Sequence, residues 1–546
     1  MVFLAQKHVS IPTKDLVSWM FDNAGMRYDW DKPIYIDAKN PTRSISAKQA
    51  RSIIRKLVAG FRAAGLERGD CVCLHGFNDV NYPMVVLGVI AAGGVFTGTN
   101  PAYTQHELIH NIKIAKVKYL ISEPEIFEPL LAAGKECHIP TENIWVFDNS
   151  GQQLPKGFCS WTTLMQHGEQ DWVCFDDEEM SKNTTAARLF SSGTTGLPKA
   201  AMLSHHNLIA EHTLVVEIVP CPHERSRILC MPMFHAAIFP SAHTACLREG
   251  ATGYVLRRFE LEYFLASIEK YRISDLGIVP PIVIATIMSP ITNKYSLRSV
   301  RAATCGAAPL GKEPQGRFEA LLADGAPFTQ VWGMTETSCI ATRIAYPERD
   351  STGSVGRFLP NLDAKLIDDD GKDITGYDVQ GEICLRGPTV TNGYFENPKA
   401  NTDSFDSEGF FKTGDIGFCD GKSKLWYIID RKKELIKVRG FQVAPPEIEA
   451  ILLSHPHIVD AAVIGVQFDR HETEFPRAYV VRRPSPEGAK LTEEEVINYT
   501  RSRLASFKRL TGGVRFMEAI PKNASGKILK RILREEAKLD LLRPSL

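Results

Sequence analysis

Between residues 69 and 336, short apolar runs alternate with longer amphipathic runs, and this alternation most strongly constrains the fold. In one amphipathic run, Leu261, Phe264, Leu265 and Ile268 recur at the spacings of three and four that indicate a helix. Strands that alternate with helices favour parallel sheets covered on both faces. We therefore predict an α/β fold here. The predicted strands are residues 71–75, 117–121, 144–147, 188–190, 228–231, 253–256, 276–279 and 300–305.

The composition and segment pattern of the sequence change twice after this region. Between residues 361 and 427, short segments punctuated by glycine are typical of a smaller antiparallel β subdomain. A charged run begins at Asp430, and the helix and strand patterns after it fit a compact α+β domain. A chain of 546 residues is also too long for one core. We predict an N-terminal domain over 1–430, with parallel α/β subdomains and a small antiparallel β subdomain, and a small mobile α+β C-terminal domain over 431–546.

Charge and cysteine content exclude several classes of protein. The 64 basic and 64 acidic residues give a formal net charge of zero, which argues against nucleic acid or an anionic membrane as a partner. The 12 scattered cysteines do not resemble a secreted disulfide scaffold, so we expect reduced thiols and a cytoplasmic location. The C-terminal Pro-Ser-Leu is a weak variant of a peroxisomal address and leaves that compartment as the alternative. We expect a monomer or a homodimer.

No integral membrane segment or signal peptide is expected. The start of the chain lacks the charged region and apolar core of a signal peptide. The longest weakly polar run, residues 82–96, is shorter than the roughly 18–20 residues that a spanning helix needs. We interpret it as a buried helix that turns at Gly93 and Gly94.

Residues 191–199, with the sequence SSGTTGLPK, favour a loop because they are rich in serine, glycine and threonine. Backbone amides, hydroxyls and one lysine in such a loop can bind a polyphosphate. The glycine spacing, and Ala200 after Lys199, exclude a Walker loop. On composition alone, a Ser/Gly-rich surface linker remains the alternative.

Further motifs follow in order along the chain. They are MPMFH at 231–235, GAAP at 306–309, QVWGMTE at 330–336, TGD at 413–415, DRKKELIKVRGFQ at 430–442 and PKNASGK at 521–527. Together with the loop they resemble the adenylate-forming superfamily, and within it the 4-coumarate–CoA ligase-like acyl-CoA synthetases. The stretches 330–336 and 430–442 are specific, whereas TGD and GAAP alone are weak. The resemblance implies an enzyme that adenylates a small-molecule carboxylic acid with ATP, releases pyrophosphate and transfers the acyl group to CoA.

The resemblance assigns nucleotide contacts to most of these motifs. Trp332, where the family more often has tyrosine, would stack on adenine, and Thr335 would reach the α-phosphate. Glu336 would hold Mg²⁺, and Asp415 would accept hydrogen bonds from the ribose hydroxyls. The implied ATP- or AMP-binding set is Ser191, Ser192, Gly193, Thr194, Thr195, Gly196, Lys199, Ala307, Ala308, Pro309, Gln330, Val331, Trp332, Gly333, Thr335, Asp415, Arg431, Lys437 and Lys527.

The same resemblance implies the catalytic and CoA-binding residues. Lys527 would bridge the carboxylate and the α-phosphate during adenylation, and Lys433 would be the pivot between the domains. The implied catalytic residues are Lys527, His235, Lys437, Thr335 and Glu336, and those implied for CoA are Arg258, Arg439, Gly440 and Gln442.

The expected acyl pocket has no obvious carboxylate or lysine, which fits an apolar aryl or medium-chain acid. Ala236 and Ala237 depart from the family's pattern and would make its floor small. The expected lining is His235, Ala236, Ala237, Ile238, Phe239, Cys305, Gly306, Gly333, Met334 and Ile340, joined by Ile282 and Val283.

Three alternatives remain at this point. Acid adenylation can also load a carrier protein, although the ligase-type segment 437–442 favours free CoA. A luciferase-like oxidation is compatible with every motif. A catalytically silent nucleotide-binding scaffold is the alternative from another class. The intact Thr335, Glu336, Asp415, Arg431 and Lys527 argue against the scaffold.

Overall fold

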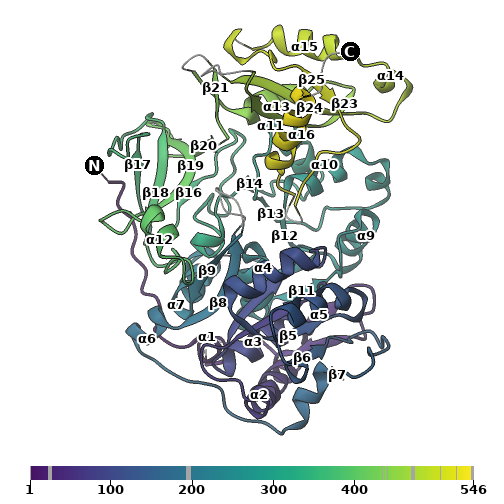
Figure 1. Ribbon diagram of the computed structural model, residues 1–546, viewed down its shortest axis with the longest axis vertical. Helices are drawn as coiled ribbons and strands as arrows, with labels where there is room; N and C mark the ends of the chain where they lie inside the picture. Colours follow the sequence, from purple (N-terminus) through teal and green to yellow (C-terminus); the bar gives the residue numbers. More distant parts are fainter. Residues whose placement is uncertain are drawn as a thin grey trace.

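The computed structural model describes residues 2–22, 28–191, 198–219, 221–432, 434–438, 441–468, 474–504, 506–523 and 526–542. Two seven-stranded sheets form the larger part of the molecule (Figure 1). One has the order β7-β6-β5-β3-β4-β8-β9 and is parallel except for the pair β8–β9. Its strands are β3 (Cys71–His75), β4 (Val95–Thr99), β5 (Val117–Ser122), β6 (Ile144–Val146), β7 (Cys159–Ser160), β8 (Thr185–Ser191) and β9 (Lys199–Ser204).

The second sheet has the order β14-β13-β12-β10-β11-β1-β2, and only the pair β1–β2 is antiparallel. Its strands are β1 (Pro33–Asp37), β2 (Ser44–Ser46), β10 (Ser226–Leu229), β11 (Thr252–Val255), β12 (Asp275–Ile278), β13 (Ala302–Cys305) and β14 (Phe328–Gln330). Each predicted strand between residues 69 and 336 overlaps an observed one, so the parallel α/β prediction is confirmed.

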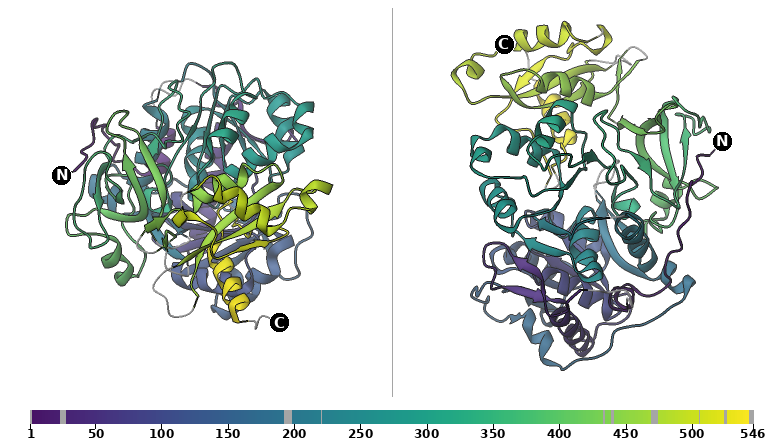
Figure 2. Two further views of the ribbon diagram at one scale, coloured as in Figure 1. Left: turned by 90° about the horizontal axis from the view of Figure 1, so that it is seen from above. Right: turned by 180° about the vertical axis from the view of Figure 1, so that it is seen from behind.

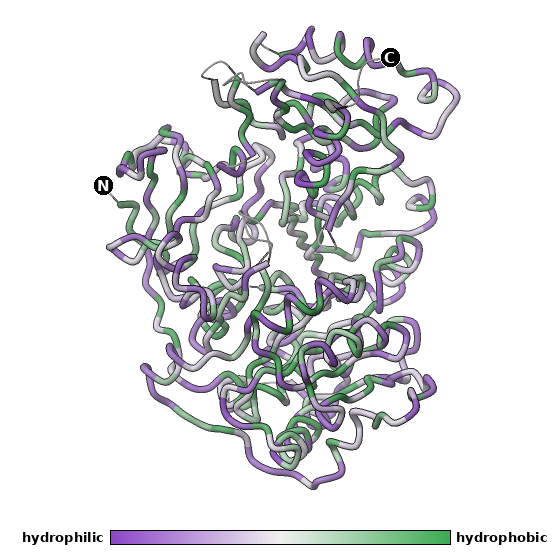
Figure 3. Tube along the Cα trace, viewed as in Figure 1, coloured by the Kyte–Doolittle hydropathy of each residue, from purple (hydrophilic) through white to green (hydrophobic). Residues whose placement is uncertain are grey.

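Helices fill the space around these sheets. α2 (Ala47–Ala63) begins with a capping box between Ser46 and Gln49 and packs against α3 (Tyr82–Ala91). All ten residues of α3 are buried, as the apolar run predicts, and the chain then turns at Gly93, whose φ is +92°. The chain is hydrophobic along the inner strands and more hydrophilic in the outer loops (Figure 3). Across the described ranges, each helix is too short or too polar to cross a membrane.

A four-stranded antiparallel sheet follows, as predicted. It has the order β17 (Asp363–Ile367), β18 (Gly381–Arg386), β19 (Phe411–Cys419) and β20 (Trp426–Arg431). The last strand extends to Arg431, so the division predicted at 430/431 falls at the end of this sheet.

The C-terminal part has its own three-stranded sheet, made of β23 (Ile458–Val466), β24 (Phe475–Arg482) and β25 (Val514–Phe516). Its helices include α13 (Pro445–Leu453), α15 (Glu493–Arg501) and α16 (Lys530–Leu542). The predicted capping box of Thr492 and Glu495 starts α15. This part lies over the edge of the second large sheet, next to α10 (Pro280–Met288), in both side views (Figures 1 and 2).

Candidate active site

A cavity of about 2090 Å³ lies between the two large sheets, the antiparallel sheet and the C-terminal part. This volume exceeds the roughly 300–1,000 Å³ of an ordinary small-molecule site. Its lining comes from loops at the carboxyl ends of β8, β10, β13 and β14, from β19 and β20, and from the segment around Lys527. Ligands of open parallel sheets bind at the carboxyl ends of the strands. The space therefore suits several substrates bound side by side.

The ends of the predicted phosphate loop lie at this cavity. Ser191 ends β8, Lys199 begins β9, and the two residues pair across the antiparallel ladder. Both line the cavity, and the Lys199 ammonium lies 4.6 Å from the centre of the Tyr394 ring. The cationic side chain is therefore held beside an aromatic face. Five predicted phosphate contacts lie outside the described residues, namely Ser192, Gly193, Thr194, Thr195 and Gly196.

Glu336 is oriented by a residue that the sequence did not indicate. It lies in the short helix η8 (Thr335–Thr337), and Thr335 and Glu336 are each 7% exposed and line the cavity. The Tyr394 hydroxyl donates a hydrogen bond of 2.8 Å to Glu336 Oε1. Burial and the nearby carboxylate raise the pKa of Tyr394, so it remains a donor. One oriented carboxylate facing a polar cavity is the hard oxygen ligand that Mg²⁺ prefers.

Asp415 is held by two side chains at the edge of the antiparallel sheet. It pairs with Arg431 across β19 and β20, and Arg431 Nε lies 3.4 Å from Asp415 Oδ1. The Trp332 indole N–H donates to Asp415 Oδ2 over 2.8 Å. Asp415 Oδ1 is buried without a hydrogen-bond partner among the described residues. Burial raises the pKa of Asp415, while Arg431 and Trp332 lower it. Oδ1 therefore lies next to the Arg431 guanidinium, and it is Arg431 that reaches the cavity.

Several predicted nucleotide contacts are placed differently. Trp332 is 8% exposed, lies outside the cavity lining and packs against Phe358. Gln330 is also outside the lining and instead bonds both backbone groups of Leu310. Its side chain thus stabilises the turn after β13. Ala308, Pro309 and Asp415 do not line the cavity either, whereas Ala307, Val331, Gly333 and Arg431 do.

His235 is placed at the acyl end of the cavity as a neutral imidazole. It precedes the short helix η5 (Ala236–Ile238), and its Nδ1 accepts a hydrogen bond of 3.1 Å from the backbone N–H of Ala237. Burial lowers the pKa of His235 to about 4. Because Nδ1 accepts, the ring proton resides on Nε2. The side chain can therefore donate to a carboxylate without carrying charge.

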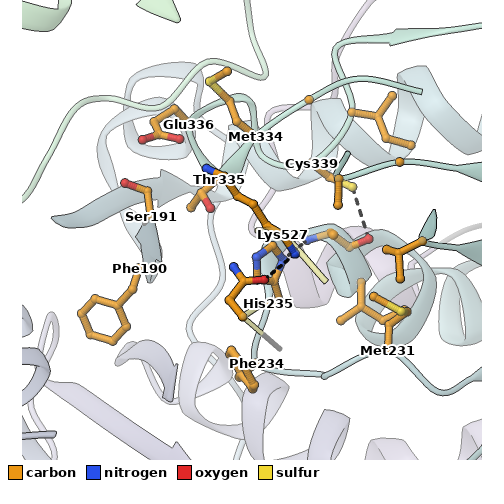
Figure 4. A pocket seen from close by; sticks show the side chains of 18 of the residues that line it. Phe190, Ser191, Met231, Phe234, His235, Met334, Thr335, Glu336, Cys339 and Lys527 are labelled. Carbon is orange, nitrogen blue, oxygen red and sulfur yellow. Dashed lines mark hydrogen bonds between the residues drawn. The ribbon is translucent and has the colours of Figure 1, made fainter. Parts of the chain in front are cut away.

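Lys527 reaches this site from the C-terminal part of the chain. Figure 4 shows it among Thr335, Glu336 and His235. Its approach depends on Gly526, whose φ is +81° and whose added Cβ would lie 2.6 Å from Pro281 Cγ on α10. Burial, followed by the charge of Arg431, lowers the pKa of Lys527 to about 8. The ammonium form therefore predominates at neutral pH.

The acyl end matches the predicted lining in part. His235, Ala237, Ile238, Gly306, Gly333, Met334 and Ile340 line the cavity. The other five expected residues are buried outside that lining, namely Ala236, Phe239, Cys305, Ile282 and Val283. Their strands and helices turn these side chains into the core instead. The expectation of an apolar lining also fails at the far end, where Arg225, Arg343 and Asp275 reach the cavity.

The hinge and CoA predictions fall largely beyond what the structure describes. Lys433, Arg439 and Gly440 lie outside the described residues, and the backbone alone is described for Lys437 and Gln442 in β21 (Ile436–Val438) and β22 (Phe441–Val443). Arg258 is exposed, stacks over Phe77 at 3.7 Å and does not line the cavity.

Comparisons with known proteins identify the family of both the N-terminal and the C-terminal part of the chain. The family model described as "AMP-binding enzyme" matches residues 21–395, and that described as "AMP-binding enzyme C-terminal domain" matches residues 447–527. A protein named phenylacetyl-CoA ligase epaB, from Aspergillus niger, is 54% identical over 98% of this chain and 99% of its own. Acyl-CoA synthetase ACTT5, from Alternaria alternata, is 51% identical over 92% of this chain and 87% of its own.

Two solved structures of one relative superpose on this chain to different extents. ATP-bound MatB from Rhodopseudomonas palustris is 28% identical and superposes with a TM-score of 0.84 over 96% of this chain and 99% of its own. Apo MatB covers the same shares but superposes with a TM-score of only 0.72. The arrangement described here is thus closer to that of the ATP-bound relative. The chain belongs to the AMP-binding enzyme family and is an AMP-forming acyl-CoA ligase, which uses ATP to adenylate a carboxylic acid and then transfers the acyl group to CoA.

Proposed function

We propose that the acid is an apolar aryl or medium-chain acid whose carboxylate lies beside His235. The apolar part of the lining supports this, because Ile238, Ile340 and Met334 border the space next to the imidazole. The neutral His235 donates from Nε2 to one carboxylate oxygen and leaves the other free to attack. Positioning of this kind supplies a large part of the catalysis of phosphoryl and nucleotidyl transfer.

We propose that Lys527 is the catalytic cation of adenylation. The carboxylate oxygen attacks the α-phosphorus in line, the new C–O–P bond forms, and the bond to pyrophosphate breaks. Negative charge accumulates on the oxygens around the phosphorus, and a lysine ammonium close to them lowers that barrier. The observation that carries this proposal is the position of Lys527 in the same cavity as His235, Thr335 and Glu336. Lys199 and Arg431 add positive charge on the phosphate and ribose sides.

The nucleotide and a metal ion fit the remaining residues. Asp415 would accept from the ribose hydroxyls beside Arg431, which lines the cavity, and Thr335 would contact the α-phosphate. Glu336, oriented by Tyr394, would hold Mg²⁺, which when bound supplies positive charge next to the phosphates. The carboxylate offers a suitable oxygen ligand, because the Tyr394 hydroxyl fixes it through Oε1.

We propose that the C-terminal domain, residues 431–546, turns about Lys433 after adenylation. This turn withdraws Lys527 and presents the segment from Lys437 to Gln442, with Arg439 and Gly440, to CoA, while Arg258 contacts CoA from the N-terminal domain. The thiolate sulfur of CoA then attacks the acyl carbon, and AMP leaves. The different TM-scores against ATP-bound and apo MatB agree with a family member that adopts more than one arrangement. We also propose a cytoplasmic location, which fits the twelve free cysteines, all of which lie in described ranges. The active form would be a monomer or a homodimer.

The test is a panel of acids that includes phenylacetate, cinnamate and octanoate, assayed with ATP, MgCl₂ and the purified full-length protein. We expect acid-dependent exchange of pyrophosphate into ATP, followed by AMP and acyl-CoA when CoA is added. Reactions without acid or without Mg²⁺ are the controls. Failure of every acid to produce AMP would contradict the proposal.

A further inference from the structure

The acyl end of the cavity continues along the face of the second sheet. β12 pairs with β10 on one side and β13 on the other, yet Gly277 in its middle is exposed. An added Cβ on Gly277 would have only Thr304 Oγ1 within 4 Å, at 3.9 Å. A central strand residue is normally covered on both faces. Gly277 and Thr304 therefore face open space, and both line the cavity.

This extension of the cavity along β12, from His235 to Asp275, is called the acyl channel, and it is longer than an aromatic ring requires. Asp275 and Gly277 lie on one face of β12 (Asp275–Ile278) because side chains alternate, and Val279 directly follows the strand. Each of them lines the cavity. Four residues of strand span about 13 Å. The channel therefore has the length of a medium-chain acyl group, with its near end at His235 and its far end at Asp275.

The far end of the channel is basic. Arg225, Arg227 and Arg343 all line it. Arg225 Nη1 lies 3.0 Å from Glu249 Oε1, and Arg227 Nη2 lies 3.9 Å from the other oxygen of the same carboxylate. Two arginines thus share one counter-charge. Arg343 has no carboxylate within ion-pairing distance in the described part of the chain, and its Nη1 donates to the carbonyl oxygen of Val215.

The remaining acidic groups nearby do not neutralise Arg343. Glu211, on α7 (His205–His212), is 1% exposed, and its Oε1 accepts from the backbone N–H of Ile340 over 2.7 Å. Burial raises the pKa of Glu211 well above its usual value, against the opposing effects of the Ile340 N–H and of Arg343, and so favours the uncharged carboxyl. Asp275 is engaged by His223, whose Nε2 lies 2.9 Å from Asp275 Oδ2. Burial lowers the pKa of Arg343 only to about 10, and the guanidinium remains charged.

Polar atoms at this end also lack partners. Arg343 Nε, Arg227 Nη1 and His223 Nδ1 are buried without a hydrogen bond to any described residue. Buried polar groups in folded proteins are nearly always satisfied, so these three side chains are incompletely neutralised within the fold. A bound acid with a polar end would compensate the arginines from the channel side, whereas a purely apolar chain would leave them facing hydrocarbon.

We propose that the acid activated by this chain is a medium-chain acid that carries an oxygen acceptor, a carboxylate or a hydroxyl, at the end remote from the reacting carboxyl, and that Arg343 binds this oxygen. The inference rests on the function proposed above and narrows its substrate class. The apolar channel contacts the chain between the two ends, and the terminal oxygen accepts a charge-assisted hydrogen bond from the guanidinium.

The test compares three acids of equal length, namely octanoate, 8-hydroxyoctanoate and octanedioate. For the purified wild-type protein, we expect kcat/KM for CoA-ester formation with at least one oxygenated acid to exceed that with octanoate by about tenfold or more, because a hydrogen bond to a charged donor is gained. Arg343→Met should abolish this preference, because the oxygenated acids lose their guanidinium donor whereas octanoate has no contact of this kind to lose. Arg357→Met is the matched control, since Arg357 pairs with Arg343 across the β15 (Thr342–Arg343) and β16 (Arg357–Phe358) ladder but bonds Glu348 instead.

Each outcome decides the inference. If kcat/KM of the wild type for octanoate equals or exceeds that for both oxygenated acids, the inference is overturned and the proposed function stays intact. An equal loss with all three acids in a folded Arg343→Met variant would also overturn it. If that variant does not fold, Arg343→Gln, which keeps a donor for Val215, replaces it with the same expected loss of preference. Absence of AMP with every acid would instead contradict the proposed function.

Discussion

Replacement of Trp332 by phenylalanine tests the arrangement of the ribose site. The indole N–H donates to buried Asp415 Oδ2 over 2.8 Å, and phenylalanine removes this donor while keeping an aromatic ring. A hydrogen bond to a charged group contributes about 1.5–3 kcal/mol. We therefore expect the KM for ATP to rise by about 10- to 150-fold in the adenylation reaction.

The cause of that rise can be separated from a general loss of nucleotide affinity. Arg431 is the remaining partner of Asp415, at 3.4 Å, so Trp332→Phe leaves the carboxylate less well oriented and its pKa higher. Discrimination between ATP and 2′-deoxyATP should therefore shrink in the variant. The assay is pyrophosphate exchange with each nucleotide at several concentrations.

Trp426→Phe is the matched control for this experiment. Trp426 is 4% exposed and packs against Phe358, as Trp332 does, so its replacement disturbs the same core without touching Asp415. We expect it to lower thermal stability while leaving nucleotide discrimination unchanged. Trp332→Phe with wild-type KM and wild-type discrimination would refute the assignment of Asp415 to the ribose.

Three further outcomes follow from the geometry. Gly333→Ala should give little folded protein or no adenylation, because its Cβ would lie 1.9 Å from the Cys339 carbonyl oxygen, and a normal melting temperature with normal activity would contradict this. The adenylation rate should fall above about pH 8, as Lys527 loses its proton, whereas reaction of supplied acyl-AMP with CoA should lack this limb; a shared limb would argue against the assignment. Tyr394→Phe should reduce adenylation about tenfold and raise the Mg²⁺ requirement, because Glu336 loses its 2.8 Å donor, and unchanged Mg²⁺ titrations would contradict that role.

Strands could be predicted from the sequence where a short apolar run is clearly separated from its neighbours. β3 (Cys71–His75) and β5 (Val117–Ser122) were predicted within one residue because each apolar run is flanked by polar or helical sequence. β4 (Val95–Thr99) was missed because it follows α3 within one continuous apolar run, in which periodicity cannot separate a buried helix from a buried strand. The antiparallel subdomain was predictable from its glycine spacing.

Residues of the site could be predicted from the sequence only where they belong to a recognisable motif. The motifs brought His235, Glu336 and Lys527 to one cavity as the resemblance implied. Their roles stay predictions. Tyr394 was missed because it lies 58 residues from Glu336, and the contact exists only in the folded chain. The basic end of the acyl channel was missed for the same reason: Arg343 comes from a short strand with no motif, and its meeting with the channel is a property of the tertiary structure.

The central claim is that one cavity serves two reactions and that Lys527 acts in only the first. Lys527→Ala measures this directly, with pyrophosphate exchange reporting adenylation and supplied acyl-AMP plus CoA reporting thioester formation. We predict a loss of about 10²–10³-fold in adenylation, in line with removal of an electrostatic stabiliser, and thioester formation close to the wild-type rate. Equal loss of both half-reactions in a variant with wild-type thermal stability would contradict the account.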